Sequence, residues 1–269
     1  MAKKLRMNSF LFCCALLGAL PVGLILLALL NITLGQLSDP EFLWLVATES
    51  EVVGTILLTF FAGLCAVIIL LIVGTPLAYL LARSATKTAK VIGTIIDLPV
   101  MLPHTIAGIL VYLLFMPNGW LGAPFSAIGI TFQDAFFGIV AAMLFVATPF
   151  YVTTVQEGFG KVPVHLENAA RTLGASPFTV FRTVTLPMTL RHISSGSVLA
   201  WGRSISEFSA VIMIAYYPMV ISTLIYNRFM TGGLKESSAV AFTMILACLL
   251  IFGILRFIAG KIGGAYDRV

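Results

Sequence analysis

LENAARTLGASPFTVFRTVTLP, residues 166–187, is the stretch that decides how the rest of this chain is understood. It brings charge, glycine and proline at regular intervals into a sequence that is 59% hydrophobic and only 10% charged, with a mean hydropathy of +1.05. Soluble domains carry about 25% charged residues. The composition therefore predicts a membrane protein, and the quoted stretch predicts a structured segment outside the lipid.

The first half of this stretch has the pattern of a short amphipathic helix. Pro163 suits a first helical turn, and Gly174 suits a left-handed C-terminal stop. Between them, apolar residues recur at the i, i+3, i+4 and i+7 spacing of one helical face: Leu166, Ala169, Ala170 and Leu173. The predicted helix is too short to cross a bilayer.

The second half restarts the chain after the glycine. Ser176 followed by Pro177 is a pair typical of an N-cap and a first helical turn. Phe178, Phe181 and Thr185 would share the next face, so we expect a second short helix that docks on the membrane bundle through its phenylalanines. Pro187 would mark the start of the following membrane helix.

Around this loop, six apolar runs are long enough to cross a hydrocarbon core as helices, which takes about 17 to 25 residues. The run with Pro76 and the run with Pro99 and Pro103 should be bent or locally broken. The predicted spans are Phe10–Leu30, Thr55–Leu81, Ile95–Phe115, Phe136–Val155, Ile193–Tyr216 and Ala239–Ile258.

Basic residues fall in alternate loops, which sets the orientation of such a chain because cytoplasmic loops are the positive ones. Only Arg228 and Lys235 lie in loops predicted to be external, and Arg203 lies inside a span. The cytoplasmic set is Lys3, Lys4, Arg6, Arg83, Lys87, Lys90, Lys161, Arg171, Arg182, Arg191, Arg256, Lys261 and Arg268. The sequence thus predicts an all-α integral membrane protein with six transmembrane helices, both termini cytoplasmic, and a short cytoplasmic helix between helices 4 and 5. Its net charge of +5 reflects this topology and does not indicate a nucleic-acid partner.

The chain lacks the sequence marks of an enzyme. No G-x-x-x-x-G-K-[ST] loop is present to hold nucleotide phosphates, and there is no nucleophile elbow or zinc-type H-E-x-x-H. The four cysteines fall in apolar spans and the three histidines show no ligand spacing, so we predict no metal site and no disulfide.

The spacing A-A-x3-G-x9-[IV]-x-L-P in the quoted stretch resembles the EAA loop of permease subunits of ATP-binding-cassette (ABC) importers. The residues that fill it are Ala169, Ala170, Gly174, Val184, Leu186 and Pro187. The family's acidic residue just before the alanines is Asn168 here, with Glu167 one place earlier. The resemblance implies a coupling helix, Leu166 to Leu173, seated on an ATPase subunit through Leu166, Glu167, Asn168, Ala169, Ala170, Arg171, Leu173 and Gly174. From the residues alone, a helix resting at the lipid interface with Arg171 and Arg182 at the headgroups is the alternative.

Two spans carry polar residues that lipid would not tolerate without a partner or a wet cavity. Arg203 and Glu207 are spaced i, i+4 and share a helical face with Ser206, so they could form a local ion pair, line a pathway, or do both. In the third span, Asp97, Pro103 and His104 interrupt an apolar run. There a kink for packing is the alternative to a water-lined site.

These two segments resemble the molybdate and tungstate permeases, with sulfate permeases as near relatives. The matching patterns are D-L-P-V-x-x-P-H-T-x-A-G at 97–108 and W-x-R-x-I-S-E-F-x-A-V at 201–211. The resemblance implies a tetrahedral oxyanion of charge −2 as cargo, with sulfate as the alternative to tungstate or molybdate. The residues expected along the pathway or gate are Arg203, Ser206, Glu207, Ser209, Asp97, Pro103, His104 and Thr105.

The resemblance also implies the partners of the chain. It predicts a second copy of the chain, two cytoplasmic ATPase subunits that carry ATP and Mg, and an external binding protein, all at a cell membrane that the chain crosses several times. The expected parts are a first helix and external loop at 1–51, a permease domain at 52–258 with its coupling loop at about 156–192, and a cytoplasmic tail at 259–269. The rival hypothesis is a stand-alone channel or an ion-coupled carrier that uses Arg203, Glu207 and Asp97.

Overall fold

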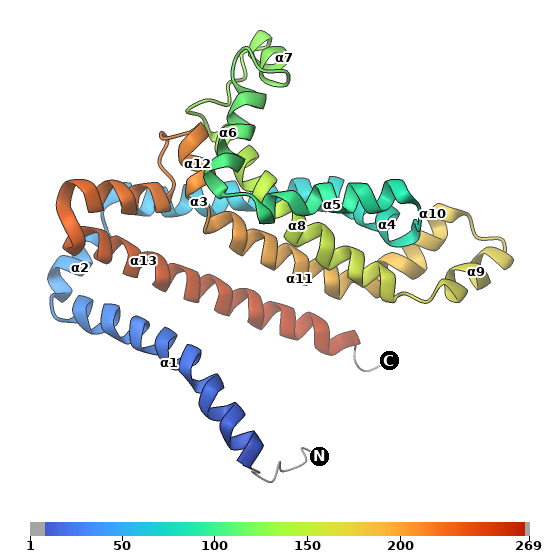
Figure 1. Cartoon of the computed structure of the whole chain (residues 1–269), viewed down its shortest axis with the longest axis horizontal. Helices are drawn as coiled ribbons and strands as arrows, with labels where there is room; N and C mark the ends of the chain where they lie inside the picture. The colour runs from blue at the N-terminus through green and yellow to red at the C-terminus, as the bar shows by residue number, and fades with distance from the viewer. Residues whose placement is uncertain (1–8, 267–269) are drawn as a thin grey trace. The chain divides into compact units, whose positions relative to one another are not determined.

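The computed structural model describes residues 9–266, with side chains at residue 10 and residues 12–254, and every regular element in this range is a helix (Figure 1). The chain divides into two compact units. Unit 1 consists of residues 1–53 and 225–256, and unit 2 consists mainly of residues 54–224. The predicted basic residues Lys3, Lys4, Arg6 and Arg268 lie outside the described residues, as does the end of the predicted tail, 267–269.

Unit 1 contains α1 (Ser9–Leu37), α2 (Pro40–Ala47) and most of α13 (Ile221–Tyr266). α13 is interrupted at Gly233, whose φ of +77° is a conformation that favours glycine. Polar contacts join the segments of this unit. Arg228 binds Glu49 and Glu51 at 2.6 Å each, and Lys235 binds Asp39 at 2.8 Å. These residues belong to the segments predicted to be external.

Unit 2 is organised around α8 (Phe136–Lys161), whose buried face runs from Gly138 to Phe159. α4 (Thr75–Arg83), α6 (His104–Phe115) and α11 (Leu186–Ile205) pack on it, and their small and branched side chains form two apolar clusters with it. The other elements of this unit are the main part of α3 (Ser50–Ile69), the π-helical turns η1 (Leu70–Gly74) and η2 (Phe181–Thr185), and α5 (Lys87–Met101), α7 (Gly122–Ala127), α9 (Val164–Thr172), α10 (Pro177–Val180) and α12 (Ser209–Ile214).

Two helical stretches contain a proline just after a π-helical turn. η1 leads into α4, whose second residue is Pro76, and η2 leads into α11, whose second residue is Pro187. Proline cannot donate to the carbonyl four residues back and its ring crowds that carbonyl, so a locally wider turn lets the helix continue. The second predicted span is therefore one helical stretch, Ser50–Arg83, and the helix that contains Pro187 already begins at Pro177.

Two predicted spans are broken. The third consists of α5 and α6, which meet at an angle of 116°, as the prolines predicted. The fifth was predicted as continuous from Ile193 to Tyr216, and this is wrong: α11 ends at Ile205 and α12 begins at Ser209.

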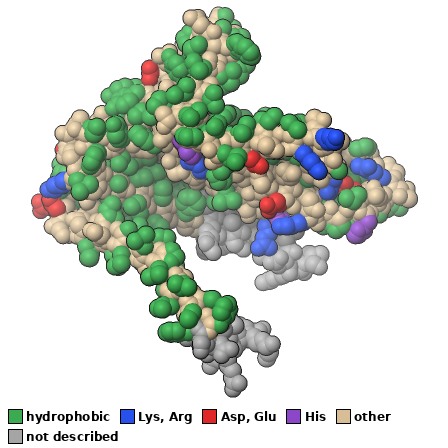
Figure 2. Space-filling view, in the orientation of Figure 1, with side chains coloured by type: hydrophobic (Ala, Val, Ile, Leu, Met, Phe, Trp, Pro, Cys, Tyr) green, Lys and Arg blue, Asp and Glu red, His purple; other side chains and the backbone are tan. Residues whose placement is uncertain are grey.

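Four described helices are long and apolar enough to cross a membrane, or five crossings if the bent α5–α6 pair counts as one. α11 is not among them because serines and charged residues dilute its apolar face. Hydrophobic side chains nevertheless cover much of the visible surface (Figure 2), as expected for a chain whose helices face lipid or other subunits.

Candidate functional site

The predicted amphipathic helix is present as α9, and it ends as the glycine predicted. Gly174 has φ +89°, and the Ala175 amide donates to the carbonyl of Ala170 at 3.1 Å, which closes the helix end. In the part of the chain that the structure describes, Lys and Arg side chains of unit 2 gather near this end of the bundle (Figure 2).

The predicted coupling residues lie on two faces of α9, one toward the bundle and one exposed. Leu166 and Ala170 are half-buried against the bundle, whereas Asn168, Ala169, Arg171, Leu173 and Gly174 are exposed, Leu173 by 89%. Glu167 is buried, with only 3% of its surface exposed. Of the two adjacent polar residues, Asn168 therefore lies on the exposed surface of α9 and Glu167 faces inward.

Glu167 is held by two partners from other elements. Its Oε1 atom accepts hydrogen bonds from Arg83 Nη2 at 2.6 Å, Arg83 Nε at 3.2 Å and Thr185 Oγ1 at 2.7 Å. Burial acts to raise the pKa of Glu167, but these hydrogen bonds and the charge of Arg83 outweigh it, so the pKa lies below its ordinary value. We call Arg83, Glu167 and Thr185 the connector node.

The predicted docking by phenylalanines is half wrong. Ser176 caps α10 as predicted, accepting from the amide of Thr179 at 3.2 Å. Phe181 packs against Tyr79 and Phe159, with ring centroids 5.0 and 6.1 Å away. Phe178, however, is 71% exposed, because Val180 takes the buried position on this short helix.

A second polar group forms where the two broken spans meet. The break between α11 and α12 contains Glu207, of which 2% is exposed, and the N-terminus of α6 contains His104. Arg203 pairs with Glu207 and also contacts the ring of His104, and its Nη1 donates to Ser206 Oγ at 3.1 Å. We call His104, Arg203, Ser206 and Glu207 the membrane cluster.

The backbone around the membrane cluster explains how it is held. Glu207 Oε1 accepts from the amide of Ala210 at 2.8 Å, so the carboxylate also caps the start of α12. α12 then packs closely on α6, because a Cβ atom added at Gly108 would lie 2.7 Å from the Cα atom of Ala210. The carboxylate and the glycine contact, together with apolar side chains of α6 and α12 in one core cluster, hold the two helices to each other.

The remaining residues of the predicted pathway occupy different places. Pro103 precedes α6 and is exposed, Thr105 is exposed in its first turn, and half-buried Ser209 is the first residue of α12. Asp97 is in α5 and contacts Thr153 Oγ1 at 3.5 Å rather than the cluster.

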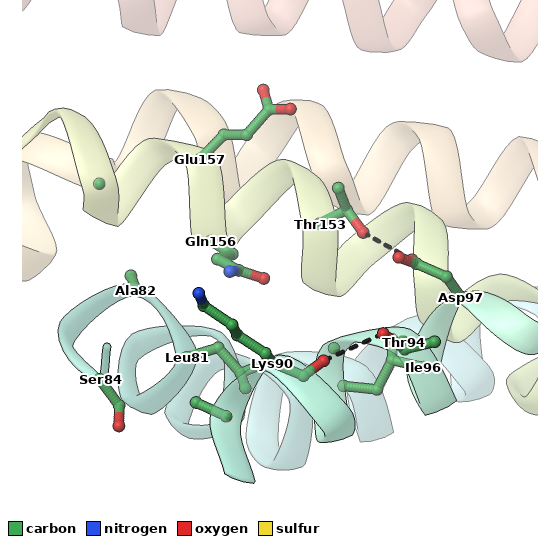
Figure 3. Close-up of a pocket in the computed structure, with 13 residues that line it drawn as sticks. Leu81, Ala82, Ser84, Lys90, Thr94, Ile96, Asp97, Thr153, Gln156 and Glu157 are labelled. Atoms are coloured by element: carbon green, nitrogen blue, oxygen red, sulfur yellow. Dashed lines mark hydrogen bonds between the residues drawn. The ribbon is translucent and has the colours of Figure 1, made fainter. Parts of the chain in front are cut away.

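Asp97 instead lines an open cavity of about 560 Å³ between α4, α5 and α8 (Figure 3). Figure 3 shows Lys90 and Asp97 of α5 facing Gln156 and Thr153 of α8, whereas the side chain of Glu157, also in α8, points away. Its lining thus combines one lysine with two carboxylates and amide and hydroxyl groups.

Sequence reasoning did not identify Arg83, Lys90, Thr153 or Gln156 as functional residues. Arg83 was counted only as a positive charge, although it is separated by 84 residues from the glutamate that it binds. No local spacing signals such a pair. The polar positions of α8, by contrast, stand out in an apolar helix and could have been noted.

Comparison with known proteins agrees with this architecture. Residues 74–263 match the family model described as binding-protein-dependent transport system inner membrane component. The molybdate/tungstate transport system permease protein WtpB of Thermococcus kodakarensis is 34% identical over 96% of this chain and 99% of its own. The sulfate transport system permease protein CysT of Salmonella typhimurium is 32% identical over 95% and 91%.

A solved structure has the same fold. It is that of a bacterial alginate ABC transporter in complex with alginate pentasaccharide-bound periplasmic protein, and it superimposes with a TM-score of 0.69 at 20% identity, covering 92% of each chain.

Proposed function

As the chain belongs to the binding-protein-dependent transport system inner membrane component family, we propose that it is the permease of an ATP-driven importer of molybdate or tungstate. The observation that carries the choice of cargo is the match to a molybdate/tungstate permease over nearly the full length of both chains. Sulfate is the alternative cargo, supported by the sulfate permease relative.

The proposed importer contains two copies of this chain, two cytoplasmic ATPases and an external binding protein. The chain itself crosses the membrane six times, with the α11–α12 pair as the crossing that polar residues obscure, and both termini are cytoplasmic. The family description names dependence on a binding protein, which supports that partner.

Cargo transfer in this proposal uses the membrane cluster. Arg203 keeps one donor on the exposed hydroxyl of Ser206, a contact that an anion can replace, while Glu207, itself bonded by the Ala210 amide, holds the guanidinium in place. A dianion that reaches Arg203 can replace the hydrogen bond to Ser206 and accept from the guanidinium. One exchangeable hydrogen bond suits passage better than tight binding. Asp97 and the cavity in Figure 3 would lie further along the route.

The test is uptake into proteoliposomes that contain the permease and its ATPases, with the loaded binding protein outside. We expect ATP-dependent accumulation of molybdate or tungstate, with sulfate as the competitor that decides between the two classes of cargo. Accumulation that persists without ATP and without the ATPases would favour the channel or carrier and reject the importer.

The proposed coupling helix has its own test in cysteine crosslinking to the ATPase. Because Asn168 is exposed and Glu167 is buried, a cysteine at Asn168 should crosslink and a cysteine at Glu167 should not. Cysteines at Ala169 and Leu173 extend the test along the exposed face. A face that fails to crosslink at all three exposed positions would reject α9 as the coupling helix.

A further inference from the structure

α9 has one buried side chain in the whole helix, and that side chain is a carboxylate. A surface helix of a globular bundle usually attaches through an apolar stripe. Here the apolar positions Leu166 and Ala170 are only half-buried, and the apolar residue Leu173 is almost fully exposed. The attachment of α9 to the bundle therefore depends on Glu167 and its partners.

The two partners, Arg83 and Thr185, connect Glu167 to three different parts of the bundle. Arg83 is the last residue of α4, and Thr185 is the last residue of η2, directly before α11. Arg83 also donates from Nη1 to the carbonyl of Phe159 at 2.9 Å and from Nη2 to that of Val162 at 3.3 Å, at the end of α8. One glutamate thus joins α9 to the cytoplasmic ends of three helices that run through the bundle.

An aromatic layer ties the same three helix ends together. Tyr79 of α4 lies 5.4 Å from Phe159 of α8 and 5.0 Å from Phe181 of η2, measured between ring centroids. Arg83 lies 5.9 Å from the centre of the Tyr79 ring. The aromatic layer holds the three helices to one another, and the connector node adds α9 to them.

From this geometry we infer that the connector node is the joint through which movement of α9 is transmitted to α4, α8 and α11. The inference rests on the proposed function, in which the ATPases move α9. The hydrogen bonds from Arg83 and Thr185 to the Glu167 carboxylate are charge-assisted and directional, whereas apolar contacts have no preferred direction. Arg83 and Glu167 are therefore positioning residues that act through α9, and they do not touch cargo or nucleotide.

The experiment measures molybdate molecules imported per ATP hydrolysed by the complete importer in proteoliposomes. Glu167→Gln should lower this ratio by at least about fivefold, the lower end of typical coupling between sites, while the ATPases still copurify with the permease. Arg83→Gln should do the same. Combining both changes should cost no more than the more severe single change, because each removes the same joint.

Arg191→Gln is the matched control, since Arg191 is an exposed arginine of α11 and no ion pair involves it among the described residues. Its ratio should equal that of the wild type. If Glu167→Gln prevents assembly, Thr185→Val removes one donor from the node and should still lower the ratio.

Two outcomes overturn the inference. One is an unchanged ratio in Glu167→Gln and Thr185→Val. The other is loss of the ATPases from Glu167→Gln but not from Asn168→Ala, which would make Glu167 the partner contact itself. Failure of the wild-type importer to take up molybdate would instead count against the proposed function, so the two failures are distinguishable.

Discussion

Glu167 and Glu207 are the two buried carboxylates of this chain's described residues, and the two are chemically alike but differently built. Each is paired with an arginine that is 18% exposed. Glu167 gathers all its donors on one oxygen, and Arg83 uses its remaining donors on carbonyls of α8. Glu207 divides its oxygens between side chains and the backbone of α12.

The difference concerns what water can reach. In the connector node, Glu167 is only 3% exposed, and its hydrogen bonds come from the partly buried Arg83 and the buried Thr185. In the membrane cluster, His104 is 38% exposed and Ser206 is exposed, so one side of Arg203 is accessible to a solute. In the two proposals, one kind of ion pair therefore has two roles: a fixed joint in the connector node and a contact for passing anions in the membrane cluster.

Removal of the carboxylate should show the largest contrast. Glu207→Ala leaves Arg203 without its partner and removes the cap from Ala210, so we expect a loss of about 3–5 kcal/mol of stability, the usual cost of breaking a buried pair. Glu167→Ala should cost less, because α9 is a short peripheral helix and the apolar clusters of unit 2 do not include it. Thermal unfolding of the detergent-solubilised permease measures both.

Glu207→Gln is the control, since its amide oxygen can still accept from the Ala210 amide and only the charge is lost. An equal loss of stability in Glu207→Ala and Glu167→Ala would contradict the distinction between the membrane cluster and the connector node.

Glycine substitutions test a steric requirement at Gly108, where α6 meets α12, and a backbone requirement at Gly174, at the end of α9. Gly108→Val inserts atoms where a Cβ alone would lie 2.7 Å from Ala210, which should cost about 1–3 kcal/mol or more through overpacking. Gly174→Ala meets no neighbour and should cost about 1–2 kcal/mol through its left-handed backbone alone. The thermal unfolding assay tests both, and a larger effect at Gly174 would show that the α6–α12 contact yields easily.

The sequence predicted many local features around these two carboxylates, but not all of the contacts that they make. The glycine stop of α9, the Ser176 cap, the broken third span and the Arg203–Glu207 pair all follow from local patterns, and the structure confirms them. Local patterns depend on neighbours within one or two helical turns.

What the sequence could not predict depends on tertiary packing. The break at Glu207 has no proline or glycine to mark it. There the Glu207 carboxylate accepts from the Ala210 amide at the start of α12, a contact that the local sequence does not signal. The inward orientation of Glu167 likewise depends on Arg83, which belongs to a distant helix. An acidic residue on a short amphipathic helix is otherwise expected to face water.

Replacing Arg203 or Arg83 by lysine should have a smaller effect, and we expect the two changes to affect different steps of transport. Lysine carries a single ammonium group and cannot reproduce the fork by which Arg203 reaches Glu207, His104 and Ser206 together. Arg203→Lys should slow molybdate uptake by about tenfold, or about 1.4 kcal/mol, at unchanged uptake per ATP. Arg83→Lys should instead lower the amount of molybdate imported per ATP hydrolysed. If both variants change this ratio equally, the connector node and the membrane cluster do not have different roles.

Acidification should have the smallest effect, and it tests the electrostatics of the connector node. The charged groups that face Glu167 are Arg83 and Arg171, and with the Thr185 hydroxyl they keep its pKa below the ordinary value of 4.5. A lowered pKa in the folded state means that the node's stabilisation is fully present above pH 4.5 and is lost only as the pH falls through the lowered value. Amide hydrogen exchange of α9, corrected for intrinsic rates, should therefore show constant protection from pH 8 to pH 5. Loss of protection within that range in the wild type, but not in Glu167→Gln, would mean that Glu167 takes up a proton there and that Arg83 does not hold it as a charged partner.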